Sequence, residues 1–184
     1  MKIYYKDITN KWLCHNPKNT IKEYRINEVF TFRKNKYKVD NHHVKYDNRE
    51  NEKEVAIWLV KRINKRITLI PDIEYPDGIK HPDYRIGNEY YDLKTIYGNS
   101  KNTIYHKIYN QSKQALNFIL YIDSKSTLTL AKIKYQMNNL YRSINPDRNW
   151  IKTIMVIYKK ELFVYTKNQW PSRRSRGNHW FLNT

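Results

Sequence analysis

Two carboxylates and one ammonium group stand close together near the middle of the sequence. Asp83 follows Pro82, and Asp92 is separated from Lys94 by a single residue, Leu93. Carboxylate oxygens are the ligands that hard divalent cations prefer, and a lysine beside such a cation can orient or deprotonate water and offset negative charge. This combination of groups is what the hydrolysis of a phosphodiester requires.

The neighbouring residues predict a hairpin that brings these groups to one face. Gly87-Asn88 is a turn signal between two runs rich in aromatic and β-branched residues, so we expect strands over residues 83–86 and 89–96. Side chains alternate along a strand, which places Asp92 and Lys94 on one face with Cα atoms ~6.6 Å apart. The turn would bring Asp83 towards the same side. An exposed hairpin with paired charges explains the three residues equally well, so the surrounding elements have to decide.

A first helix is predicted over residues 51–65 and supplies a third acid. Its apolar stripe consists of Val55, Ala56, Leu59 and Ile63. Glu52 precedes these residues at helical spacing and shares their inward face, where a carboxylate is costly without a partner or a metal ion. Glu52 is therefore the candidate, and Glu54, which lies away from the stripe, is expected to be solvated. Glu50 remains an alternative if the helix begins earlier.

A second helix is predicted over residues 103–117, with Thr103 as its cap. Lys107, Gln111 and Gln114 fall at i, i+4 and i+7 and form a polar stripe beside the packing face. A solvated helix edge would have the same pattern. Amides beside a metal site can bind phosphate oxygens or position the attacking water, so Gln111 and Gln114 are candidate catalytic residues. Lys107 is a candidate contact for nucleic acid.

The remaining pattern predicts one domain with three parts. An accessory N-terminal segment covers residues 1–48 and contains a hairpin over 23–32 and 36–44. A catalytic core covers residues 51–123, with short buried strands over 67–70 and 118–122. Residues 124–184 add a helix over 126–143, a hairpin over 151–158 and 162–166, and a basic tail. The acids at positions 72, 74 and 77 are interpreted as loop residues that cap turns.

The charge of the chain predicts a polyanionic partner. Lys and Arg number 35 against 17 Asp and Glu, for a formal net charge of +18. The 17 Tyr and the aromatic content of 15% favour nucleic acid over membrane, because bases offer faces for stacking and no apolar run of spanning length is present. Arg173, Arg174 and Arg176 form a basic arm that can track phosphates, although a frayed terminus is equally consistent with them.

Cysteine and histidine usage points away from a disulfide framework or a zinc cluster. Cys14 is the sole cysteine, and the histidines lack zinc-ligand spacing. The adjacent His42 and His43 are expected to be solvated at a strand end. No apolar segment suited to a signal peptide follows Met1, which favours a reducing compartment, although a segment cut from a larger exported protein would look the same.

The Pro-Asp element followed by Asp-x-Lys, in the order helix, strand, hairpin, helix, strand, resembles the PD-(D/E)XK nuclease superfamily. The resemblance implies an α/β (α+β) fold with an αβββαβ core, in which helices flank a mixed central sheet, here with an N-terminal β-rich elaboration and a C-terminal hairpin. It implies that Glu52, Asp83 and Asp92 hold a divalent metal ion, Mg²⁺ being favoured over Mn²⁺ and Zn²⁺. It also implies that Lys94 orients or deprotonates the attacking water.

Several stretches are more narrowly similar to the C-terminal tRNase domains of contact-dependent growth inhibition toxins and related polymorphic toxins. These stretches are residues 52–59, 69–71, 80–83 and 91–95, and the helix carrying Gln111 and Gln114. This resemblance implies a metal-dependent endoribonuclease that cleaves structured RNA, with tRNA favoured. It further implies release from a longer delivery protein, action in a cytoplasm and neutralisation by an immunity protein. A DNA endonuclease of restriction or repair type and a non-catalytic nucleic-acid-binding module remain the alternatives.

Overall fold

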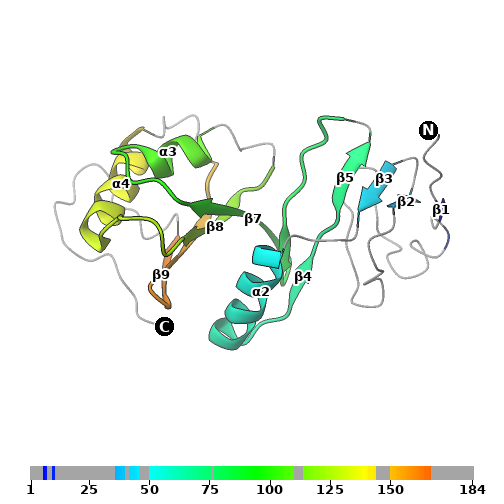
Figure 1. Ribbon diagram of the computed structural model, residues 1–184, viewed down its shortest axis with the longest axis horizontal. Helices are drawn as coiled ribbons and strands as arrows, with labels where there is room; N and C mark the ends of the chain where they lie inside the picture. Colours follow the sequence, from blue (N-terminus) through cyan, green and yellow to red (C-terminus); the bar gives the residue numbers. More distant parts are fainter. Residues whose placement is uncertain are drawn as a thin grey trace. The chain divides into compact units, whose positions relative to one another are not determined.

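The computed structural model describes residues 6–7, 10, 36–39, 42–45, 50–75, 77–109, 114–143 and 150–166 (Figure 1). The chain divides into two compact units, Met1–Tyr90 and Tyr91–Thr184. The expectation that both belong to one nuclease domain stays a prediction.

The strands form two sheets. The smaller sheet has the order β1-β2-β3-β5, with β1 at Lys6–Asp7, β2 at Lys36–Val39, β3 at His42–Lys45 and β5 at Asp72–Tyr75. The larger has the order β10-β9-β8-β7-β6-β4, with β4 at Ile67–Leu69, β6 at Tyr84–Ile86, β7 at Glu89–Ile96, β8 at Asn117–Ile122, β9 at Thr153–Tyr158 and β10 at Glu161–Thr166. The pairs β7–β8 and β8–β9 are parallel, whereas β4–β6 and β9–β10 are antiparallel. The larger sheet is therefore mixed, as expected.

Three helices accompany these strands in the described part of the chain: α2 at Glu50–Ile63, α3 at Thr103–Ile108 and α4 at Leu130–Ser143. The fold is thus a mixed α/β fold. From α2 to β8, the elements of the larger sheet and its helices follow the predicted order of helix, strand, hairpin, helix and strand. Among the described residues, no helix is long and apolar enough to cross a bilayer.

The first unit packs α2 against the strands that follow it. The buried residues of α2 are Glu52, Val55, Ala56 and Leu59. This set confirms the predicted helix phase, because Glu52 shares the face of the apolar stripe and Glu54 is exposed. On β6, Tyr84 is fully buried and its hydroxyl donates to the backbone carbonyl of Glu52 at 2.7 Å. This bond ties the first turn of the helix to the strand that begins directly after Asp83.

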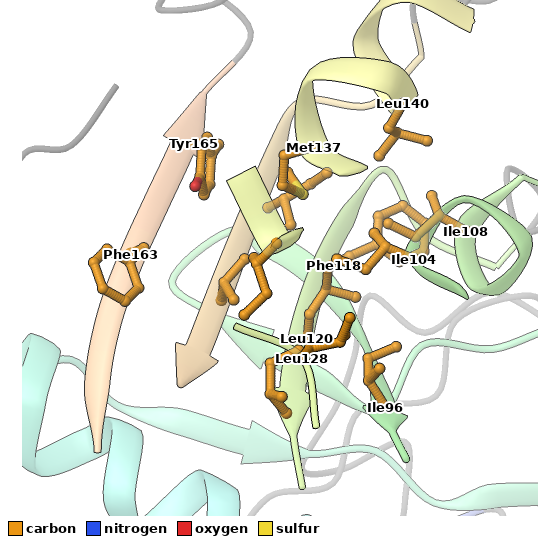
Figure 2. Close-up of a cluster of buried hydrophobic side chains, with 14 of the residues drawn as sticks. Ile96, Ile104, Ile108, Phe118, Leu120, Leu128, Met137, Leu140, Phe163 and Tyr165 are labelled. Carbon is orange, nitrogen blue, oxygen red and sulfur yellow. The ribbon is translucent and has the colours of Figure 1, made fainter. Parts of the chain in front are cut away.

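The core of the second unit lies around β8 and the two helices (Figure 2). Its fully buried or nearly buried members include Ile104 and Ile108 of α3, Phe118 and Leu120 of β8, Ile133, Met137 and Leu140 of α4, and Phe163 and Tyr165 of β10. A strand between two parallel neighbours usually consists almost entirely of apolar residues. Strand β8 has this pattern, with the sequence Asn-Phe-Ile-Leu-Tyr-Ile. Helices α3 and α4 lie in the two connections between parallel strands, which need long crossovers.

Hydrogen bonds from one buried amide and from exposed loop side chains fix the position of the short helix α3. The side chain of Gln136 on α4 is only 2% exposed, and it accepts from the backbone N–H of Ile104 and donates to the carbonyl of Ser100, both at 2.9 Å. The loop before α3 is also bonded to the loop before α4, through Asn99 to Thr127 and Ser126 to Gly98. A six-residue helix is marginal alone, so these contacts hold it in place.

The ends of two predicted helices and the assignment of one segment to a loop are wrong. The second helix does not extend to residue 117, because α3 ends at Ile108, Gln114 lies in a turn and Asn117 begins β8. Asp72 and Glu74 lie in strand β5, which pairs with β3, and not in a loop. The third helix begins at Leu130, after Thr129, whose hydroxyl accepts from the backbone N–H of Lys132.

The N-terminal hairpin also differs from the prediction. Residues 36–44 were expected to be one strand, but the antiparallel pair is formed within this stretch, between β2 and β3, and pairs Tyr37 with Val44. The predicted partner strand, residues 23–32, lies outside the described residues. The C-terminal hairpin is confirmed, with Glu161 opposite Tyr158 across the turn Lys159–Lys160.

Candidate functional site

Asp92 and Lys94 form a close ion pair on β7. The distance from Lys94 Nζ to Asp92 Oδ2 is 2.6 Å, and the Asp92 side chain is fully buried while that of Lys94 is 18% exposed. The pair confirms that the two side chains share one face of the strand. Because the carboxylate is buried, the alternative of an exposed charged hairpin is wrong for Asp92.

The position of this pair in the sheet explains its burial. In β7, Asp92 lies opposite Phe118 of β8 and Lys94 opposite Leu120. Both of these β8 residues are fully buried, and Leu93, between the two charges, is also buried. A carboxylate in such surroundings is costly unless it is paired, and the ammonium of Lys94 at this distance provides the opposite charge.

Gln114 joins the pair from the turn that precedes β8. Its Oε1 accepts a hydrogen bond from Lys94 Nζ at 3.5 Å. The ammonium of Lys94 is therefore held between a carboxylate and an amide oxygen. Gln114 was predicted to act beside a metal site, which stays a prediction; the structure shows its contact with Lys94, without the helical stripe that suggested it. Lys107 is exposed on α3, and Gln111 lies outside the described residues.

The other two predicted acids belong to the first unit. Glu52 is 7% exposed, in the first turn of α2. Asp83 is half-buried, and its backbone carbonyl accepts from the N–H of Ile70 at 2.9 Å. The sequence reasoning did not single out Tyr84, whose hydroxyl links the turn of Glu52 to β6. An aromatic residue with a hydroxyl directly after the Pro-Asp element was the available signal.

A divalent metal ion is part of the prediction for Glu52, Asp83 and Asp92. Across the described residues, no group of three or more His, Cys, Asp and Glu side chains is placed to hold a metal ion. Mg²⁺ is commonly held by one or two carboxylates, with water and substrate phosphates completing its shell, whereas zinc sites use three or four protein ligands. Metal binding by the carboxylates of this chain stays a prediction. The identity of the ion stays a prediction.

The predicted basic arm is not placed by the structure. Arg173, Arg174 and Arg176 lie outside the described residues, and their contact with nucleic acid stays a prediction. His43 is half-buried in β3 and not solvated at a strand end.

Comparison with known proteins finds a match that includes the paired residues. Residues 80–162 match the family model for the contact-dependent growth inhibition CdiA C-terminal domain. This stretch, a little under half of the chain, contains Asp83, Asp92, Lys94 and Gln114 but not Glu52. Over it, the chain is similar to the C-terminal toxin domain of CdiA.

One solved structure is also similar. A chain of the CdiA-CT/CdiI toxin and immunity complex from Burkholderia pseudomallei aligns with 22% identity and a TM-score of 0.48, over 63% of this chain and 82% of that one. No curated protein matches the chain.

Proposed function

We propose that this chain is a toxin domain of the contact-dependent growth inhibition type that hydrolyses phosphodiester bonds in structured RNA, with tRNA as the favoured substrate. The observation that carries the proposal is the buried Asp92 carboxylate bound to Lys94, whose ammonium also contacts Gln114. The family match over residues 80–162 supports the toxin class. The PD-(D/E)XK assignment belongs to the same proposal and rests on the order of elements and on these residues.

Each residue has a role that follows from its chemistry. The resemblance to PD-(D/E)XK nucleases assigns a divalent ion to Asp92 and Asp83, and to Glu52 directly or through water; such an ion would supply charge neutralisation at the phosphate and a more acidic water. Lys94 would orient or deprotonate the attacking water, and its positive charge would offset the negative charge that develops on the oxygens of the pentacoordinate phosphorus. The contacts from Asp92 and Gln114 hold its ammonium in one place.

Two other functions remain to be tested against this one. A DNA endonuclease would use the same residues, because a metal-dependent site needs no 2′-hydroxyl nucleophile. A non-catalytic nucleic-acid-binding module would need only basic and aromatic side chains. Such a module gains nothing from a buried carboxylate paired with a lysine, so the Asp92–Lys94 pair favours an enzyme.

The toxin class carries further expectations about partners. A CdiA C-terminal domain is delivered as part of a larger CdiA protein, so we propose that this chain acts in the cytoplasm of a recipient cell after such delivery. A cognate immunity protein would then be needed in the producing cell, because the proposed activity is toxic to it.

The test is to incubate the purified protein with total RNA and with plasmid DNA, each in Mg²⁺ and in EDTA. The proposal expects cleavage of the tRNA fraction in Mg²⁺ and none in EDTA. Cleavage of plasmid alone would establish the DNA alternative. Binding of RNA without cleavage in Mg²⁺, Mn²⁺ or Zn²⁺ would establish the binding module and overturn the enzyme.

A further inference from the structure

The outer surface of helices α3 and α4 combines exposed tyrosines with basic side chains. Neither the stretch 97–109, which contains α3, nor the stretch 130–143, which forms α4, contains Asp or Glu. We call its exposed basic and aromatic side chains the α3–α4 outer face: His106, Lys107, Tyr109, Lys132, Lys134 and Tyr135.

The phase of each helix accounts for this exposure. Ile104 and Ile108 of α3 and Ile133 of α4 are fully buried, and Figure 2 shows the two α3 residues directed into the core. In α4, Tyr135 is two residues from Ile133 and so lies on the opposite side of the helix, where its side chain is 49% exposed. The ring of Tyr135 is therefore partly open to solvent on the outer side of α4.

Tyr109 is also exposed and is supported by a second ring. At the C-cap of α3 it is 40% exposed, and its ring lies 4.8 Å from that of Tyr105, with an interplanar angle of 33°. Tyr105 is half-buried and packs against the core cluster. The contact restrains Tyr109, so little rotamer entropy remains to be lost when another aromatic group binds to it.

The surface charge of the second unit as a whole favours an anionic ligand. In the described part of the second unit, the exposed lysines are Lys101, Lys107, Lys125, Lys132, Lys134, Lys152, Lys159 and Lys160. Within the same residues, Glu161 is the exposed acid, whereas Asp92 is buried and Asp123 is half-buried. Lysines beside exposed aromatic rings are the combination that binds phosphates and stacks bases.

We propose that the α3–α4 outer face binds an unpaired, single-stranded segment of nucleic acid, with Tyr109 and Tyr135 stacking on bases and Lys107, Lys132 and Lys134 contacting phosphates. The inference rests on the proposed function in one respect: the bound segment belongs to the RNA substrate. It adds a recognition site for unpaired nucleotides, which would direct the enzyme to loops and ends of a structured RNA and away from its helical stems.

The experiment measures binding of a labelled single-stranded oligoribonucleotide by fluorescence anisotropy in EDTA, where the proposed enzyme cannot cleave. Tyr135→Ala is compared with Tyr135→Phe, because phenylalanine keeps the ring and alanine preserves the helix. We expect the alanine variant to bind about fivefold to a hundredfold more weakly and the phenylalanine variant to bind like wild type.

An abasic oligonucleotide of the same length and charge is the control ligand, because it keeps the phosphates and lacks the bases. The proposal expects Tyr135→Ala to bind it as wild type does, since no base is present to stack. Base stacking at this face is overturned if Tyr135→Ala binds the normal oligoribonucleotide with wild-type affinity. It is also overturned if the variant loses affinity for the abasic oligonucleotide by the same factor as for the normal one.

The lysines are tested by the salt dependence of binding. The double variant Lys132→Gln and Lys134→Gln should lower the slope of log affinity against log salt by roughly 0.7 for each phosphate contact removed. The matched control is Lys159→Gln with Lys160→Gln, which removes the same charge from the exposed turn between β9 and β10. Equal slopes for the two double variants would show that non-specific charge accounts for binding.

These outcomes are independent of the proposed enzyme activity. If wild type fails to cleave RNA in Mg²⁺ but the ring and lysine variants lose binding as described, the proposed function fails and the binding face stands. If wild type cleaves tRNA and the variants bind and cleave as it does, the binding face fails and the proposed function stands.

Discussion

Asp92 and Glu52 are both carboxylates in buried positions, and each is explained by its nearest residues. Asp92 is balanced by Lys94 at 2.6 Å. Glu52 lies at the first turn of α2, where the partial positive charge of the helix N-terminus favours an anion. Each acid thus has positive charge or partial positive charge beside it.

Glu52 can be tested against a neighbour on the same helix. Glu52→Gln should lower cleavage at least roughly tenfold, because an amide is a weaker partner for a hard cation or for a water bound to it. Glu54→Gln is the matched control, since Glu54 is exposed two residues away. Initial rates of tRNA cleavage in Mg²⁺ measure the effect. Equal rates for the two folded variants would remove Glu52 from the site.

At the scale of elements, the bond from Tyr84 to Glu52 connects β6 with α2. Tyr84→Phe removes only the hydroxyl and should lower the free energy of unfolding by about 1 kcal/mol, the usual net value of a buried hydrogen bond. Urea denaturation followed by circular dichroism measures this change. Tyr121→Phe is the control, because the half-buried Tyr121 hydroxyl makes no hydrogen bond within the part of the chain that the structure describes. A Tyr84 variant as stable as the control would show that the bond does not stabilise this unit.

Sequence reasoning found elements whose signals are local and missed those that depend on distant partners. The 3.6-residue period placed α2 to within two residues at each end and assigned Glu52 inward. Strand β5 was missed because its partner is β3, nearly thirty residues earlier, and half of its residues are acidic. The second helix was extended past Ile108 by residues with good helix propensity, but the start of β8 at Asn117 requires the chain to leave the helix.

In the candidate site, too, the features set by local sequence were predicted and those set by distant residues were not. The alternation along β7 is local, and it correctly placed Asp92 beside Lys94. That Asp92 is fully buried depends on β8, which no spacing within the hairpin encodes. Gln114 was selected through a helical register that the structure does not have, and it contacts Lys94 because its turn leads into the neighbouring strand.

At the scale of the whole molecule, the formal charge of +18 predicts binding controlled by salt. If six or more phosphates are contacted, affinity for tRNA should fall about a thousandfold or more between ~50 and ~200 mM salt, because each contact releases counterions. The measurement is anisotropy of labelled tRNA in EDTA across this range. An affinity that does not change with salt would remove the polyanion hypothesis, and with it both proposals.

The central claim is that the Asp92–Lys94 pair is catalytic. The direct measurement is the rate of tRNA cleavage in Mg²⁺ for wild type, Asp92→Asn and Lys94→Ala. Thermal melting accompanies it, because an unpaired charge left at this buried position lowers stability. Lys94→Gln provides a second variant in case the alanine variant does not fold.

We expect every folded variant to lose at least about a hundredfold in rate while still binding tRNA in EDTA, since the other basic residues remain. A folded Asp92→Asn or Lys94 variant that cleaves at the wild-type rate would contradict the account and leave the pair as a structural ion pair.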